Sequence, residues 1–88
     1  MRLDKFLKVS RLIKRRTVAK EVCDAGRVTV NDRVAKAGTE VGVGDEISLS
    51  LGRRWLRIRV VEIRETVPAQ AAQDLYEVLD QTAVDDLG

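Results

Sequence analysis

The sequence contains few of the residues on which most catalytic and metal sites depend. Among its 88 residues there is no His, and there is only one each of Cys, Met, Trp, Tyr and Phe. Without His, and with Cys23 alone, a structural zinc site, a Ser–His or Cys–His nucleophile and an internal disulfide are all excluded. Carboxylates and lysines remain, but no pair of them lies in an apolar stretch that would tune a pKa. We therefore expect a binding protein without cofactor or metal, and not an enzyme.

The chain also lacks any long apolar run. Its longest uninterrupted runs hold two to three apolar residues, whereas a membrane-spanning helix needs about 20. Charge begins at Arg2, and no apolar stretch follows that could form a signal peptide. We therefore expect no membrane contact and a cytoplasmic location. The length is that of one small domain.

Basic residues are concentrated at the start of the chain. The first 36 residues hold eleven Lys and Arg and four acids, a net charge of +7, whereas the whole chain carries +2. The remaining 52 residues therefore carry −5. So uneven a distribution, placed on predicted helices, is typical of a protein that binds a polyanion.

The apolar spacing of the first residues predicts a helix followed by a turn. Leu3, Phe6 and Leu7 follow the i, i+3, i+4 pattern of one apolar helix face. Residues 10–14 indicate the turn that ends this helix. Leu12 and Ile13 within this turn are possible core residues.

The second helix is predicted over residues 17–25. Thr17 is expected to be its N-cap, because a hydroxyl can accept a hydrogen bond from the first turn. Val18, Val22 and Ala25 are predicted to face the core, with Ala19 and Cys23 flanking that face. Gly26 stands where a glycine commonly ends a helix in the left-handed conformation.

After the second helix the apolar spacing changes from 3.6 to 2, which predicts a sheet. Asn31 and Asp32 tolerate a positive φ and are expected to form a tight turn, and Gly44-Asp45 closes the loop before the next strand. Val60-Val61 interrupts the alternation, which predicts a bulge or a strand buried on both faces. The expected strands, the last two paired as a hairpin, are 28–30, 47–51 and 55–63, and the chain resumes at Val34-Ala35 after the tight turn.

The chain is acidic beyond Pro68. This part contains no Lys or Arg and five acids, Asp74, Glu77, Asp80, Asp85 and Asp86. A short amphipathic helix is predicted from the helical spacing of Ala72, Leu75, Tyr76 and Leu79. We therefore predict two parts, an α+β domain over residues 1–65 and an acidic, partly helical C-terminal extension over residues 66–88.

A resemblance to a known family rests on the order of these motifs. The run MRLDKFLKVSRLIKRRTVAKEVCDAGRVTVNDRVAK, followed by VGVGDEI, resembles the small RNA-binding domain first seen in bacterial small-subunit ribosomal protein four. The helix–turn–helix and strand of that domain are called the alpha-L motif. The resemblance covers about residues 1–64. It implies two N-terminal helices packed on a small, mostly antiparallel sheet.

The opening residues are most similar to one stand-alone group of this family, the ribosome-associated quality-control proteins P (RqcP, also called YabO). Membership would imply a monomer that binds rRNA and peptidyl-tRNA on stalled large ribosomal subunits. It would also imply a partner, RqcH, and a role in adding alanine tails to nascent chains. A related alternative is the fifteen-kilodalton heat-shock protein, which binds large subunits that carry a nascent chain.

Eight basic side chains of the helix–turn–helix are the candidate RNA contacts. Clustered cations can neutralise a phosphate wall, and Arg can bind phosphate at two points or stack on a base. The resemblance gives most weight to Arg2 and Arg16. The predicted RNA-binding residues are Arg2, Lys5, Lys8, Arg11, Lys14, Arg15, Arg16 and Lys20.

Several alternatives stay open on the sequence alone. A helix–turn–helix can also bind DNA, and a basic face can dock an acidic protein. In strict alternation Trp55, Arg57 and Arg59 share one strand face, which is either a stacking platform for unpaired bases or the edge of the core. Cys23 is expected to be a small core side chain.

Overall fold

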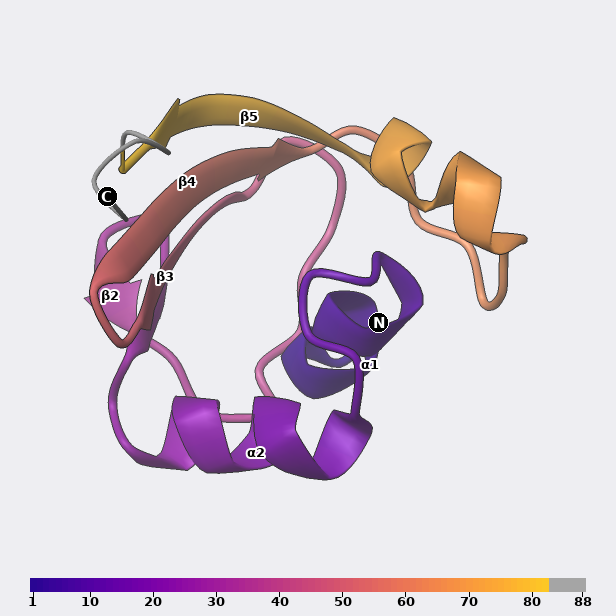
Figure 1. The fold of residues 1–88 in the computed structure, drawn as a ribbon. Helices are drawn as coiled ribbons and strands as arrows, with labels where there is room; N and C mark the ends of the chain where they lie inside the picture. Colours follow the sequence, from indigo (N-terminus) through magenta and orange to yellow (C-terminus); the bar gives the residue numbers. More distant parts are fainter. Residues whose placement is uncertain (83–88) are drawn as a thin grey trace.

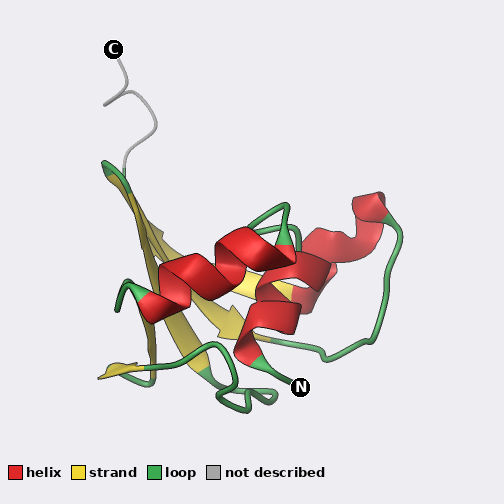
Figure 2. Cartoon of the chain, turned by 90° about the horizontal axis from the view of Figure 1, so that it is seen from below, coloured by secondary structure: helices red, strands yellow, loops and turns green. Residues whose placement is uncertain are grey.

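The computed structural model describes residues 1–82. Two helices lie against one side of a curved five-stranded sheet, as Figure 1 shows, and seen from below they stand in front of the strands (Figure 2). All strand pairings are antiparallel, in the order β2-β1-β3-β4-β5. The elements are α1 (Leu3–Val9), α2 (Arg16–Asp24), β1 (Val28–Val30), β2 (Arg33–Val34), β3 (Glu46–Leu51), β4 (Arg54–Val60), the 3-10 helix η1 (Ala69–Leu75) and β5 (Tyr76–Gln81). The predicted α+β fold is confirmed.

Helix α1 buries the face that its sequence predicts. Leu3, Phe6 and Leu7 are completely buried and pack with residues of the sheet in one core. The predicted turn follows the helix, and Ile13 returns to the core, with its N–H donating to the carbonyl of Leu7 at 3.0 Å. Arg11 lies within this turn in the left-handed conformation, at φ 64°. The loop between the helices is therefore fixed by a backbone hydrogen bond and by the burial of Ile13 in the core.

Helix α2 begins and ends one residue earlier than the sequence predicts. It begins at Arg16 and has no side-chain cap, so Thr17 is not its N-cap. Ala19 and Cys23 are buried, whereas Val18 is 40% exposed. The small side chains of Ala19 and Cys23 let the helix pack closely against its neighbours. The packed face is therefore the one that carries these two residues, and Val18 lies outside it.

The end of α2 confirms the expected role of Gly26. This residue has φ +76°, and its N–H donates to the carbonyl of Cys23 at 2.9 Å. The N–H of Arg27 donates to the carbonyl of Val22 at 3.2 Å. These two bonds are the pair that ends a helix in a Schellman motif.

The predicted tight turn at Asn31-Asp32 is confirmed, whereas the predicted bulge is misplaced. Asn31 and Asp32 have φ of 52° and 69°, the positive pair that a type I′ turn requires. Strand β4 ends at Val60, and its register irregularity with β5 lies between Arg57 and Ile58. Val60 and Val61 break the alternation because the strand stops there.

The C-terminal region is only partly the predicted helix. Residues 69–75 form the 3-10 helix η1, which buries Ala72 and Leu75. The chain then extends, and β5 pairs with β4 along residues 76–81. An open edge of β4 offers unpaired backbone groups, and pairing with them outweighs the helical spacing that includes Tyr76 and Leu79. Asp85 and Asp86 lie outside the described residues.

Candidate nucleic-acid interface

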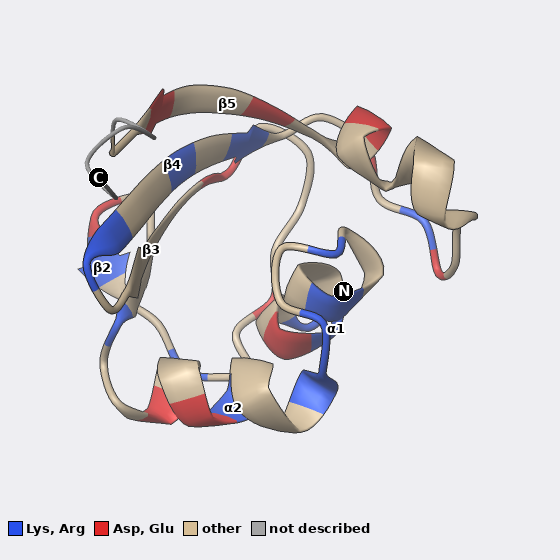
Figure 3. Cartoon of the chain, in the orientation of Figure 1, with Lys and Arg blue, Asp and Glu red and all other residues tan. Residues whose placement is uncertain are grey.

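Seven of the eight predicted RNA-binding residues lie on the two helices or in the loop that joins them, and Arg2 lies just before the first helix. Arg2 precedes α1, which carries Lys5 and Lys8, and Arg11, Lys14 and Arg15 lie between the helices, ahead of Arg16 and Lys20 in α2. Figure 3 shows basic residues on α1, in the loop and at the start of α2, and acidic residues in the later part of α2 and, away from the helices, on η1 and β5. We call the eight residues the cationic surface.

A buried carboxylate joins the two arginines that the resemblance singles out. Asp4 is only 3% exposed and lies in the first turn of α1. Its carboxylate accepts hydrogen bonds from Arg2 Nε at 3.2 Å and Arg2 Nη2 at 3.4 Å. It also accepts one from Arg16 Nη2 at 3.4 Å. Asp4 therefore holds guanidinium groups from either side of the helix–turn–helix next to each other.

The electrostatics of Asp4 follow from this contact. Burial alone would raise the pKa of its carboxyl group, but the hydrogen bonds and charges of Arg16 and Arg2 outweigh burial. The pKa of Asp4 therefore lies below its ordinary value of 3.8. The side chains of Arg2 and Arg16 remain 49% and 48% exposed. Each guanidinium can thus keep its bond to Asp4 and still present N–H groups to a phosphate.

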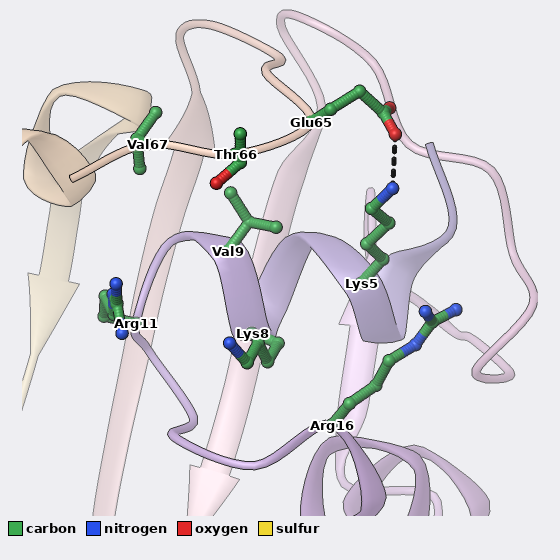
Figure 4. Close-up of a pocket in the computed structure, with 8 residues that line it drawn as sticks. All are labelled: Lys5, Lys8, Val9, Arg11, Arg16, Glu65, Thr66 and Val67. Atoms are coloured by element: carbon green, nitrogen blue, oxygen red, sulfur yellow. Dashed lines mark hydrogen bonds and ion pairs between the residues drawn. The ribbon is translucent and has the colours of Figure 1, made fainter. Parts of the chain in front are cut away.

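A groove of about 300 Å³ lies between α1 and the segment that follows β4. Figure 4 shows that Lys5, Lys8, Arg11 and Arg16 surround it. Val9, Thr66 and Val67 also line it. Four cations around a partly apolar hollow suit a phosphate with its attached sugar.

One cation of this groove is paired with an acid. Lys5 Nζ forms an ion pair with the Glu65 carboxylate, as the dashed line in Figure 4 shows. This contact lowers the pKa of Glu65. Among residues 1–82, Lys8 and Arg11 take part in no such pair. Lys8 and Arg11 are therefore the two groove cations that form no ion pair with an acid of these residues.

The remaining residues of the cationic surface lie outside this groove. Lys14, Arg15 and Lys20 are exposed and do not line it. They extend the positive charge along the loop and α2. The structure thus brings together Arg2 with Arg16, and Lys5, Lys8 and Arg11 with Arg16, while the other three are peripheral.

Two arginines of β4, Arg57 and Arg59, are arranged differently, because acids compensate them. Arg57 contacts Glu46 at 2.8 Å and Asp32 at 3.2 Å. Arg59 contacts Glu77 at 2.9 Å and Glu46 at 3.6 Å. Hydrogen bonding from Arg57 lowers the pKa of Glu46. A stacking platform built from Trp55, Arg57 and Arg59 would therefore need these ion pairs to be broken.

Comparison with known proteins identifies the family. The S4 domain family matches residues 1–47. The chain belongs to the S4 domain family. An RQC P-site tRNA stabilizing factor of Halalkalibacterium halodurans is 59% identical over 78 residues, which cover 89% of both chains. One of Bacillus subtilis is 48% identical over 81 residues, 92% of this chain and 94% of the relative. These relatives confirm the resemblance to the RqcP group.

A solved structure supports the same fold for this S4 chain. Trimeric heat shock protein 15 of Vibrio cholerae superposes with a TM-score of 0.83 at 33% sequence identity. The match covers 89% of this chain and 80% of that protein. The likeness extends well past the residues that the S4 domain match covers, so the later strands are shared as well.

Further observations bear on the other sequence predictions for this S4 chain. Cys23 is buried as predicted, and burial raises its thiol pKa to about 11. Within residues 1–82, no helix has the length and apolar character to span a membrane. In the same residues no three His, Cys, Asp or Glu side chains gather as metal ligands.

Sequence reasoning missed two acids of this S4 interface, Asp4 and Glu65. Asp4 carried one signal, because an acid in the first turn of a helix is favoured by the helix dipole. That signal does not reveal its contact with Arg16, twelve residues away. Glu65 lies 60 residues from Lys5, and nothing local to either residue indicates their pairing.

Proposed function

We propose that this protein is a non-catalytic RNA-binding factor whose ligands are rRNA of the large ribosomal subunit and tRNA in the P site. The observation that carries this proposal is the pair of half-exposed arginines held by buried Asp4. The S4 domain match and the names of the RqcP-type relatives support it independently.

The geometry favours recognition of RNA shape over base sequence. Arg2 and Arg16 are fixed at one point by Asp4, so less side-chain freedom is lost when they bind phosphate. The neighbouring cations Lys8 and Arg11 can contact further phosphates along the same backbone. Contacts to phosphate and sugar position a protein on RNA without reading its sequence.

The cellular role that fits these ligands is ribosome-associated quality control in the cytoplasm. The factor would bind stalled large subunits that carry peptidyl-tRNA. It would hold the P-site tRNA, or a nearby rRNA helix, while RqcH delivers alanyl-tRNA for C-terminal alanine tailing. We propose that it acts as a monomer. The RqcP-type names support the tRNA and quality-control parts, and the resemblance to that group suggests RqcH.

The salt dependence of RNA binding tests the interface directly. If about 6 phosphates are contacted, affinity for a structured rRNA fragment should fall by roughly three orders of magnitude between 50 and 200 mM salt. Arg16→Ala should weaken binding and reduce the slope of log K against log salt by about 1. Arg64→Ala is a matched control, because Arg64 is paired with Glu62 and is not part of the cationic surface. A salt-independent affinity, or equal effects of the two variants, would contradict the proposal.

A heat-shock-type large-subunit factor is the second candidate. The likeness to heat shock protein 15 of Vibrio cholerae, with its TM-score of 0.83, favours it. The two roles differ in their dependence on RqcH. Deletion of the gene should abolish alanine tails in cells that contain RqcH if the first role is correct, and leave them intact if the second is.

DNA binding and protein docking remain weaker alternatives. The exposed face of α2 offers Lys20, Glu21 and Asp24, and this set suits a phosphate backbone better than base edges, since it lacks the Asn or Gln that reads adenine. Tighter binding to duplex DNA than to structured rRNA would favour a DNA regulator. Co-purification with an acidic protein after RNase treatment would favour docking.

A further inference from the structure

A second groove, of about 440 Å³, lies between the α1–α2 loop and the ends of β3, β4 and β5. Leu12, Leu51 and Leu56, all partly buried, form part of its wall. Val78, which is 45% exposed, lies on the same wall. The groove is thus an apolar hollow that the core does not fill.

Two aromatic side chains contribute to this groove. Trp55 is 44% exposed at the start of β4, and Tyr76 is partly buried at the start of β5. Both line the groove. An exposed aromatic beside partly buried apolar residues offers a flat surface on which a planar group can stack.

The lining of the groove also includes basic residues. Arg11 comes from the α1–α2 loop and Arg54 from the β3–β4 hairpin, and both line the groove. Unlike Arg57 and Arg59 further along β4, neither forms an ion pair with an acid of residues 1–82. Gln81 adds a side-chain amide to the lining. A ligand that fits must therefore combine negative charge with a flat, largely apolar group.

Arg11 connects this groove with the cationic surface. It lines both the groove beside Arg16 and the groove beside Trp55. Its left-handed backbone, at φ 64°, lies at the point where the chain turns between the two helices. A phosphate chain bound at Arg11 therefore has one groove on either side of it.

We propose that this second groove binds an unpaired nucleotide of the RNA, with its base against Trp55 and its phosphates at Arg11 and Arg54. The proposal rests on RNA being the ligand of the cationic surface. A nucleotide has the required combination of a phosphate and a π face, and stacking on aromatic residues tolerates any base. A paired base has both faces covered by its neighbours in the helix, so the groove selects a junction between a helix and a single strand.

The occurrence of a single Trp makes the proposal directly measurable. Trp55 is the only Trp of the chain, so intrinsic Trp fluorescence reports on this groove alone. The probes are a blunt RNA hairpin and the same hairpin with a six-nucleotide single-stranded extension, each titrated into the full-length protein. Fluorescence anisotropy of the labelled RNA gives affinity independently of Trp55.

The extended hairpin should bind about five- to a hundredfold more tightly than the blunt one, since stacking on one aromatic side chain contributes on that scale. It should also quench Trp55, whereas the blunt hairpin should not. Trp55→Ala should remove the gain in affinity, and Trp55→Phe should retain most of it. Arg54→Ala should reduce the salt dependence for the extended hairpin only. Val61→Ala is the control, because Val61 is exposed and does not line the groove.

Failure of this proposal is distinguishable from failure of the proposed function. Equal affinities for the two hairpins, with unchanged Trp55 fluorescence, would overturn the second site and leave RNA binding by the cationic surface intact. Absence of binding by both hairpins would overturn the proposed function. Quenching of Trp55 by an acidic apolar peptide, and not by extended RNA, would assign the groove to a protein ligand and overturn the proposal.

Discussion

Replacement of Asp4 by Asn tests how the fold positions its two principal arginines. Asparagine keeps the shape of the side chain but removes the charge that Arg2 and Arg16 share. It can accept hydrogen bonds through one oxygen only. We therefore expect Asp4→Asn to lower the stability of the fold and to release both guanidinium groups.

The expected loss of stability follows from burial. Hydrogen bonds to a charged group contribute about 1.5–3 kcal/mol when buried. The Asp4 side chain is 4% exposed, but both arginine partners are about half exposed, so solvent screens much of their attraction. We expect a loss of about 1–2 kcal/mol in the free energy of unfolding. For a domain of this size that corresponds to a decrease in Tm of about 5–15 °C.

The pH dependence of this loss has a defined sign. The pKa of Asp4 is lower in the folded protein than its ordinary value of 3.8, so folding favours the ionised form. Its contribution is complete at pH 7, which is above the unfolded value. It disappears as the pH falls below about 4 and approaches the lowered folded pKa. The stabilities of wild type and Asp4→Asn should therefore converge in acid.

Urea unfolding from pH 7 to pH 3, followed by circular dichroism, measures both effects. Glu40→Gln is a matched control, because Glu40 is 78% exposed and pairs with the N-terminal ammonium group. The control should change stability little at pH 7. Equal stability of wild type and Asp4→Asn at pH 7, or a difference that persists undiminished in acid, would refute the reasoning.

Three further predictions concern other parts of the fold. Glu65→Gln removes the partner of Lys5 and should raise RNA affinity at low salt roughly twofold or more, an effect that 0.5 M salt should abolish in a filter-binding assay. Cys23, with a thiol pKa near 11, should resist a thiol reagent at pH 8 and react only after unfolding in urea; rapid reaction in native buffer would contradict its burial. Leu7→Ala in the completely buried core should decrease the free energy of unfolding by about 2–5 kcal/mol, and a loss below 1 kcal/mol would show that the site is not packed as described.

The parts of the fold that depend on neighbouring residues were predictable from the sequence. Leu3, Phe6 and Leu7 define a helix face by spacing alone. The turn at Asn31 and Asp32 is set by residues that tolerate positive φ. Gly26 marks the end of α2 for the same kind of reason. In each case the residues that determine the structure are close together in the chain.

The errors arose where distant segments decide the outcome. The packed face of α2 is set by how closely the helix approaches the rest of the core, which favours Ala19 over Val18. Residues 76–81 become a strand because β4 leaves an edge to be paired, although Tyr76 and Leu79 fit a helical pattern. The division of the chain at residues 65 and 66 stays a prediction, and β5 shows that part of the extension joins the sheet.

The candidate interface follows the same rule. The sequence shows which residues are basic, but not which acids they meet. Asp4 joins Arg2 with Arg16, whereas Glu46 neutralises Arg57. Arg2 and Arg16 share one buried acid and stay about half exposed, whereas Arg57 is compensated by two acids of the sheet side. Such a difference depends on contacts between elements, which no local pattern specifies.

Sucrose-gradient sedimentation of cell lysate tests the central claim most directly. Wild type, Arg16→Ala and the control Arg64→Ala are each detected across the gradient at low salt, after circular dichroism has established that all three are folded. The account predicts that wild type and Arg64→Ala migrate with free large ribosomal subunits, whereas Arg16→Ala stays at the top. Wild-type protein that stays at the top, or Arg16→Ala that migrates with the large subunit as fully as wild type, would contradict it.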